Sequence, residues 1–282
     1  MAYKSILTVA TSADKASAQL DTAVAFARRE DAHLDVLCLG IDRLQTGYYY
    51  VGAAPIVPVM VQETLDQADS DARAVEAAVR ARLAPEDIRW AVDTAIAQIG
   101  SLGAEVGRLA RFADLVLVSQ PYGQGAAPEQ EAILEAALFD GRAPALVLPK
   151  TTSDAACGKR ILIAWNQSDE AMSAVRAALP LLKAASMVDV AVIAPPTHGP
   201  ERSDPGGMLS QYLSRHGVRS EVSVLARTLP HVSDQICRHC EDVNADMVVM
   251  GAYGHSRFRE AILGGTTREM FEIATVPVLT AH

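Results

Sequence analysis

The chain repeats itself, and this repeat limits its fold more than any other feature of the sequence. Three short segments of the first half recur in the second half at a spacing of roughly 130 residues, which is the size of one α/β domain. We therefore expect a duplicated domain. The matching pairs are Ala113–Val118 with Ala245–Met250, Glu131–Leu134 with Glu260–Leu263, and Ala143–Val147 with Val276–Leu279.

Each half alternates short apolar segments with amphipathic ones. Ser5–Val9 and Ile88–Val92 are typical of strands, and each half contains five such segments. Lys15–Arg29 is typical of an amphipathic helix, and Arg268–Ala274 predicts a helix near the C-terminus. Strands that alternate with helices form parallel sheets through right-handed crossovers. The sequence thus predicts an α/β protein with two tandem doubly wound parallel-sheet domains, residues 1–150 and residues 158–282, with a small polar linker between them.

Composition and charge argue against several classes of protein. The 282 residues carry a net charge of −9, which disfavours binding to nucleic acid or to an anionic membrane surface. No apolar run approaches the roughly 20 residues that a membrane-spanning helix needs, and no signal peptide is apparent. Four cysteines are too few for a disulfide scaffold in a chain of this length. We expect a cytoplasmic protein with no nucleic-acid partner and no membrane partner.

Glycines cluster directly after a strongly apolar segment near the C-terminus. Met247–Met250 is typical of a buried strand, and Gly251, Gly254 and the pair Gly264–Gly265 follow it. Glycine allows the backbone to approach a phosphate closely, and the first N–H groups of a following helix point towards such an anion. The pattern predicts a phosphate site at the carboxyl end of a parallel strand.

The spacing Gly251-x2-Gly254-x9-Gly264 resembles the G-x2-G-x9-G-[ST] signature of the universal stress protein (UspA-like) family. Both halves resemble universal stress domains, so the resemblance covers nearly the whole chain. It implies an adenine nucleotide alpha hydrolase-like fold, a role in the stress response, and ATP with Mg²⁺ as the ligand of the second half. Two positions depart from the family pattern, because Gly265 replaces the signature Ser or Thr and Asn166 replaces an Asp.

The resemblance also implies which residues would contact the nucleotide. In the family, the residue after the first strand and the backbone at the end of the second strand contact adenine and ribose, and the glycine loop contacts the phosphates. The residues at these positions are Asn166, Ser168, Ile193, Gly251, Gly254, His255, Gly264, Gly265, Thr266 and Thr267. A plainer interpretation stays open, in which Gly251 and Gly254 serve only a tight turn and Gly264–Gly265 serve only close helix packing.

The first half has lost the glycine pattern. Ser119 and Tyr122 stand where the second half has Gly251 and Gly254, and Glu135 stands at the position of Gly264. Because a carboxylate repels phosphate, we expect no ATP binding of this kind in the first half. We expect it to act as a partner domain or as a site for a different ligand.

Two functional hypotheses follow. The first is a stress-response protein that senses or carries an adenine nucleotide. The second is a nucleotide-free scaffold or a binder of a different small ligand, with partners on its surface. Since no Walker lysine, histidine pair or carboxylate dyad is evident, slow ATP hydrolysis is the most catalysis that we expect. The last strands of the two halves are apolar enough to pair with each other, and a homodimer is a further expectation.

Cys237 and Cys240 form the other conspicuous cluster. Two thiols three residues apart lie on one face of a helix, where a metal or redox role is conceivable. The sequence holds no second ligand pair at zinc-site spacing, and cysteine is also a small buried residue. Core packing is therefore the favoured interpretation. Arg257, Arg259 and Arg268 flank the glycines and could neutralise phosphate or form surface ion pairs.

Overall fold

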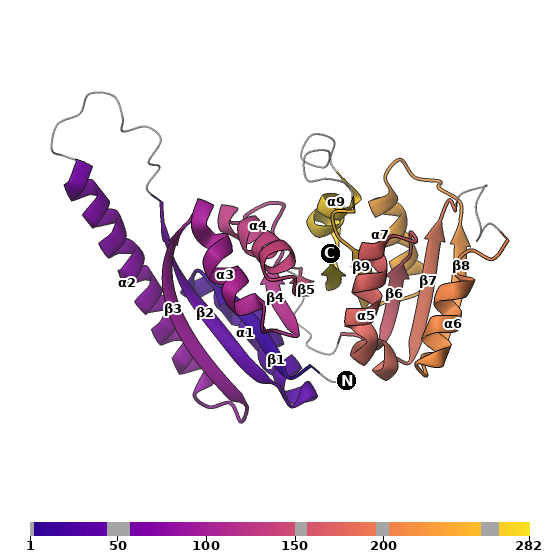
Figure 1. The fold of residues 1–282 in the computed structure, drawn as a ribbon, viewed down its shortest axis with the longest axis horizontal. Coiled ribbons are helices and arrows are strands. Elements are labelled where there is room, and N and C mark those ends of the chain that lie inside the picture. Colours follow the sequence, from indigo (N-terminus) through magenta and orange to yellow (C-terminus); the bar gives the residue numbers. More distant parts are fainter. Residues whose placement is uncertain (1–2, 44–56, 150–156, 196–202, 255–264) are drawn as a thin grey trace. The chain divides into compact units, whose positions relative to one another are not determined.

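A computed structural model shows strands alternating with helices along the whole chain (Figure 1). It describes residues 3–43, 57–149, 157–195, 203–254 and 265–282. The first half contains β1 Ser5–Ala10, α1 Ala13–Glu30, β2 His33–Asp42, α2 Val57–Leu83, β3 Arg89–Gln98, a 3₁₀ turn Ile99–Ser101, α3 Leu102–Ala110, β4 Leu115–Ser119, α4 Pro128–Glu135, a π-helical turn Ala136–Asp140 and β5 Ala145–Leu148.

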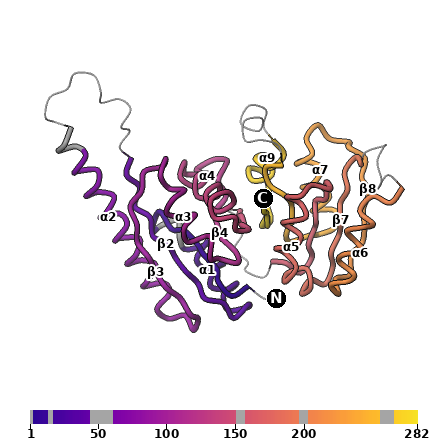
Figure 2. Tube along the Cα trace, in the orientation of Figure 1, coloured from indigo at the N-terminus to yellow at the C-terminus, as the bar shows by residue number. Residues whose placement is uncertain are grey.

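The second half follows the same order. It contains β6 Arg160–Ala164, α5 Asp169–Ala184, β7 Met187–Ile193, α6 Gly207–Arg215, β8 Ser220–Leu225, α7 Val232–Asp242, β9 Met247–Gly251, α9 Thr266–Ile273 and β10 Val278–Ala281. The continuous colour change in Figure 2 follows this second series from β6 to the C-terminus.

The strands are parallel within each half, as the sequence predicted. In the first half β1 pairs with β2 and β4, and β2 pairs with β3 along the full length of both strands. In the second half β6 pairs with β7 and β9, β7 pairs with β8, and β9 pairs with β10. The exception is β5, which is antiparallel to β10 with Val147 opposite Val278. Each half therefore has the α/β fold of a mostly parallel sheet.

Contacts divide the chain into two compact units. One consists of Tyr3–Leu117 and Glu131–Ala143, and the other consists mainly of Val118–Gln130 and Pro144–His282. The strand β5 belongs to the second unit because it pairs with β10. The expected domain boundary falls on residues 150–156, which lie outside the described residues, so the limits 1–150 and 158–282 stay a prediction.

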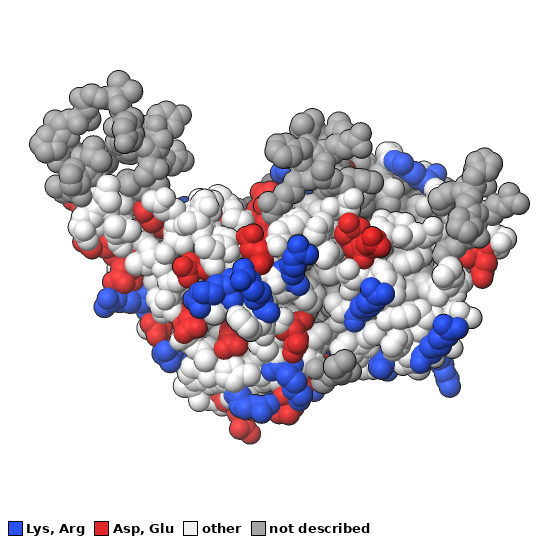
Figure 3. Space-filling model, viewed as in Figure 1, with Lys and Arg blue, Asp and Glu red and all other residues white. Residues whose placement is uncertain are grey.

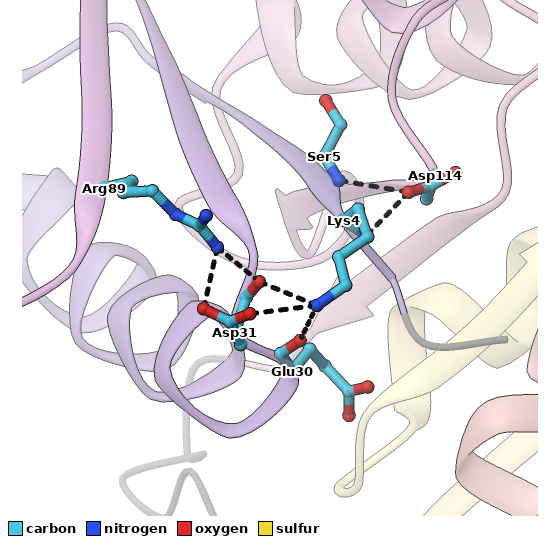
Figure 4. A network of polar contacts seen from close by, with 6 residues as sticks. All are labelled: Lys4, Ser5, Glu30, Asp31, Arg89 and Asp114. Atoms are coloured by element: carbon cyan, nitrogen blue, oxygen red, sulfur yellow. Dashed lines mark hydrogen bonds and ion pairs between the residues drawn. The ribbon is translucent and has the colours of Figure 1, made fainter.

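The same contact between an Asp carboxylate and backbone N–H groups occurs in both halves, at the beginning of the first strand of each half. Asp114, just before β4, accepts hydrogen bonds from the backbone N–H groups of Lys4 and Ser5 at 2.7 and 3.0 Å (Figure 4). Asp246, just before β9, accepts them from Gly158, Lys159 and Arg160 at 2.9–3.1 Å. The repeat that is visible in the sequence thus extends to individual hydrogen bonds.

A second group in Figure 4 joins the end of α1 to β3. Asp31 follows α1 in the left-handed conformation, with φ 51°, and its carboxylate contacts Lys4 Nζ at 3.1 Å and an Arg89 nitrogen at 2.7 Å. The hydrogen bond from Lys4 is the main cause that holds the pKa of the Asp31 carboxyl below its usual value, and the positive charge of Arg89 adds to it. Because Asp31 is exposed, we regard this as an orienting contact rather than a major source of stability.

Helices cover both faces of the second sheet. At β9, Gly251 abuts the first turn of α5, whereas Val248 faces α7 and α9 on the opposite side. Side chains of successive strand residues alternate between the two faces, so this division follows from the strand itself. All four residues Met247–Met250 are buried, as expected for a strand with helices on both sides.

Candidate functional site at the carboxyl edge of the second sheet

Two neighbouring strands bring the expected site residues of the second half together. Because β6 and β9 are parallel, with Ala164 opposite Met250, the segments that follow them leave the same edge of the sheet. Asn166 and Ser168 follow β6, and Gly251 and Gly254 lie at the end of β9 and just beyond it. Ligands of doubly wound sheets bind at this edge, so the topology places these four residues where a ligand site is expected.

Asn166 and Ser168 build the turn into α5. The Asn166 Oδ1 atom accepts a hydrogen bond from the Ser168 N–H group at 3.1 Å. Ser168 is the N-cap of α5, and its Oγ accepts a hydrogen bond from the Ala171 N–H group at 3.1 Å. These oxygens therefore shape the turn, while Asn166 is exposed and keeps its amide donors for other contacts.

Gly251 is required for packing. A side-chain carbon at this position would lie 2.5 Å from the backbone nitrogen of Ala171 and 2.7 Å from the carbonyl carbon of Glu170. Gly251 does not have a positive φ, so the need is for space and not for an unusual conformation. Close packing against α5 is therefore the role that fits Gly251, whereas the plainer interpretation assigned it to a tight turn.

Gly254 differs from Gly251, because it is exposed and faces a side chain. A carbon added to Gly254 would lie 3.1 Å from the Glu170 Oε2 atom, at the end of a flexible chain. Sequence reasoning missed Glu170, since only the fold brings the first turn of α5 against the glycines. The consequence is that a carboxylate stands beside the surface on which a phosphate would rest.

One of the two residues between these glycines, Tyr253, takes the left-handed conformation. Tyr253 has φ 57°, which is unfavourable for a residue with a side chain. Its N–H group donates to Thr267 Oγ1 at 3.2 Å, and its hydroxyl lies 3.2 Å from the hydroxyl of Tyr122. The Arg268 guanidinium lies over the Tyr122 ring, 4.7 Å from its centre. Sequence reasoning found Thr267 and Arg268 but not the tyrosines.

The helix α9 begins earlier than expected, at Thr266 instead of Arg268. Gly265 is its N-cap and has no side chain, so the N-cap residue cannot satisfy the first N–H groups of the helix. The bond between the Tyr253 N–H group and Thr267 ties this helix start to the glycine segment. Thr267 is buried and Thr266 is half-buried.

The remaining expected residues fall into two groups. Ile193 ends β7, next to β6, and is half-buried at the same edge of the sheet. His255, Gly264, Arg257 and Arg259 lie outside the described residues.

Close to the expected contacts, the indole N–H group of Trp165 is buried and has no hydrogen-bond partner among the described residues. A buried donor without a partner is unfavourable, so Trp165 is a candidate contact for an acceptor atom of a ligand.

The surface of the described residues carries charges of both signs. On the face drawn in Figure 3, Lys and Arg side chains are interspersed with Asp and Glu side chains. The described part of the chain contains no group of three His, Cys, Asp or Glu residues that could hold a metal ion. No described helix is long and apolar enough to cross a membrane.

Comparison with known proteins shows a similarity in the second half. Residues 158–282 match the model of the universal stress protein family. A universal stress protein from Synechocystis sp. is 36% identical over 74 residues, which cover 26% of this chain and 25% of that protein. The match thus spans about a quarter of that relative's length.

Solved structures extend the similarity in fold to nearly the whole chain. A universal stress protein from Archaeoglobus fulgidus matches with a TM-score of 0.71 and 16% identity, covering 98% of this chain and 95% of that one. A functionally unknown protein from Pseudomonas aeruginosa matches with a TM-score of 0.58 and 16% identity, covering 98% and 92%. At this identity the likeness establishes the fold alone.

Proposed function

We propose that this chain is a universal stress protein that acts in stress response by binding an adenine nucleotide at the carboxyl edge of its second sheet. The match of residues 158–282 to the family model supports the proposal. ATP is the nucleotide that the glycine spacing implies. The protein would sense or carry this ligand in the cytoplasm.

One observation carries the proposal. The glycine segment after β9 is tied to the start of α9 by the bond from the Tyr253 N–H group to Thr267 Oγ1. This bond brings the exposed Gly254 to the first turn of a helix that lacks a capping side chain. Backbone N–H groups at a helix start attract phosphate, and glycine allows it to approach. The described residues therefore fit a phosphate group.

Other described residues fit the rest of a nucleotide. The exposed amide of Asn166 offers donors to a sugar or base, although it lacks the charge of the family's Asp. The buried N–H group of Trp165 offers a further donor nearby. The carboxylate of Glu170 beside Gly254 repels a phosphate, so a divalent cation such as Mg²⁺ is needed to offset this charge.

Direct analysis of the purified protein tests the proposal. The protein is isolated without added ligand and denatured, and the supernatant is analysed for adenine nucleotide. The refolded or nucleotide-free protein is then titrated with ATP and Mg²⁺ by calorimetry. We expect bound nucleotide, or binding at cellular ATP concentration. No nucleotide and no binding at millimolar ATP would refute the proposal.

A second candidate is a scaffold that binds no nucleotide. The carboxylate of Glu170 beside Gly254 favours it, as do the oxygens of Asn166 and Ser168 that are already engaged in the turn. In this case the antiparallel pair of β5 and β10 would join the two repeats, and a homodimer would extend the surface for partners. Light scattering with and without ATP separates a constitutive assembly from one that depends on nucleotide.

A further inference from the structure

Three sulfur-containing residues line one small cavity away from the glycine segment. Cys237 and Cys240 lie one turn apart on α7, and Met270 lies on α9, which packs against α7. The cavity measures about 10 Å³, and apolar residues such as Val248 and Ala274 complete its lining. A space of this size accommodates a single water-sized particle and excludes an organic ligand.

Two of these residues hold their sulfur atoms at the spacing of ligands of one metal ion. Cys237 Sγ lies 3.8 Å from Met270 Sδ. Two sulfur ligands that are each about 2.3 Å from a metal in a trigonal arrangement lie about 4.0 Å apart. Cys240 lines the same cavity, and its present bond to the Ala245 carbonyl, at 3.4 Å, is weak because a thiol is a weak donor. Turned into the cavity, this thiol would complete a set of three sulfur ligands.

The surroundings favour a cation over a bare thiolate. The negative charges of Asp234 and Glu241, which lie on the same helix, act on Cys237. The same negative charges attract a positive ion, whose charge would replace the two thiol protons. Cys237 is only half-buried, so an ion has a path from solvent to the cavity.

We propose that Cys237, Cys240 and Met270 bind one copper(I) ion. Thiolate and thioether sulfur atoms select soft ions such as copper(I), which accept two or three ligands. Zinc normally requires four ligands, and the imidazole of His239, which lies between the two cysteines in sequence, is engaged elsewhere, because its Nε2 contacts Asp189 Oδ1 at 2.9 Å. Binding forms two copper–thiolate bonds and one thioether bond, and releases two protons to solvent.

Copper(I) supplied as its acetonitrile complex, under anaerobic conditions, tests the site in the full chain. Competition with the chelator bicinchoninate measures affinity, and X-ray absorption identifies the ligand atoms. We expect one copper(I) per chain, with sulfur neighbours at about 2.3 Å. The change Met270→Leu, which conserves volume, should weaken binding at least about tenfold without loss of the fold.

Matched variants separate this site from other thiols. The double change Cys237→Ser/Cys240→Ser should abolish binding, whereas Cys38→Ala/Cys157→Ala should retain it. Circular dichroism checks that each variant is folded. Equal binding by Cys237→Ser/Cys240→Ser, unchanged affinity in Met270→Leu, or no copper retained by the unaltered protein would each show that the three sulfur atoms only fill the core.

Discussion

The hydroxyl groups of Tyr122 and Tyr253 lie 3.2 Å apart, and both side chains are buried. Tyr253 stands between the two glycines after β9, and Tyr122 follows the equivalent strand of the first half, β4. The first half thus contributes a side chain to the support of the glycine segment, although it has lost that segment's sequence.

This pair predicts a coupled loss of stability. Tyr122→Phe and Tyr253→Phe each remove one hydroxyl from a buried contact, which should cost about 1 kcal/mol of unfolding free energy. Because both changes remove the same hydrogen bond, the double variant should lose less than the sum of the single variants. Urea unfolding of the four proteins measures this, and simple additivity would show that the two hydroxyls do not interact.

The two motif glycines should respond differently to alanine. Gly251→Ala places a carbon 2.5 Å from the backbone of α5 and should lower the unfolding free energy by about 1–3 kcal/mol. Gly254→Ala meets only the movable end of Glu170 and should leave stability nearly unchanged while weakening ATP binding. Thermal unfolding and ATP titration of both variants test this. Unchanged ATP affinity in Gly254→Ala would place the phosphate site elsewhere.

Glu170 should make ATP binding depend on a divalent cation. Its carboxylate lies beside Gly254, so neutralising it with Glu170→Gln should raise the affinity for ATP in the presence of EDTA. Affinity in the presence of Mg²⁺ should change much less. Asp169→Asn, on the adjacent exposed position of α5, is the matched control. An equal effect of both variants would point to general electrostatics and not to this contact.

The sequence predicted the strands and helices well, because the spacing of apolar residues and the internal repeat indicate the same elements. Every expected strand of both halves is present, and the parallel order follows from the alternation of elements. Differences arise where hydrogen bonding to a neighbouring strand extends a strand beyond the segment that its own residues predict. The strand β3 was expected to end at Val92 but continues to Gln98, since β2 offers ten residues to pair with.

The candidate site was harder to predict, because its geometry depends on contacts across the fold. The glycine spacing led to Gly251 and Gly254, but their different roles depend on the first turn of α5. Glu170 and Tyr122 carried no local signal, since their partners lie far away in the sequence. A π-helical turn at Ala136–Asp140 also had no visible signature in the sequence.

The repeated carboxylate contact predicts unequal losses in the two halves. Asp246 is half-buried and accepts bonds from three backbone N–H groups, so Asp246→Ala should cost about 1–3 kcal/mol of unfolding free energy. Asp114 is exposed and accepts from two, so Asp114→Ala should cost less. Asp246→Asn, which keeps one oxygen acceptor, should recover part of the loss. Chemical denaturation measures all three, and an equal cost at both positions would contradict the argument.

The thiols of the folded protein should react slowly and lower its stability at high pH. Burial raises the pKa of Cys38 and Cys240 to about 12 and that of Cys237 to about 11, from a usual value of 9.0. A pKa two units higher reduces the reactive thiolate about 100-fold near neutral pH. In the variant Cys157→Ser, the disulfide reagent DTNB should therefore react much faster with the unfolded chain than with the folded one. A rapid release of reagent colour from the folded variant at pH 8 would show that the thiols are not held in this way.

Because each thiol pKa is higher in the folded state, the stabilisation is full below pH 9 and is lost as pH rises towards 12.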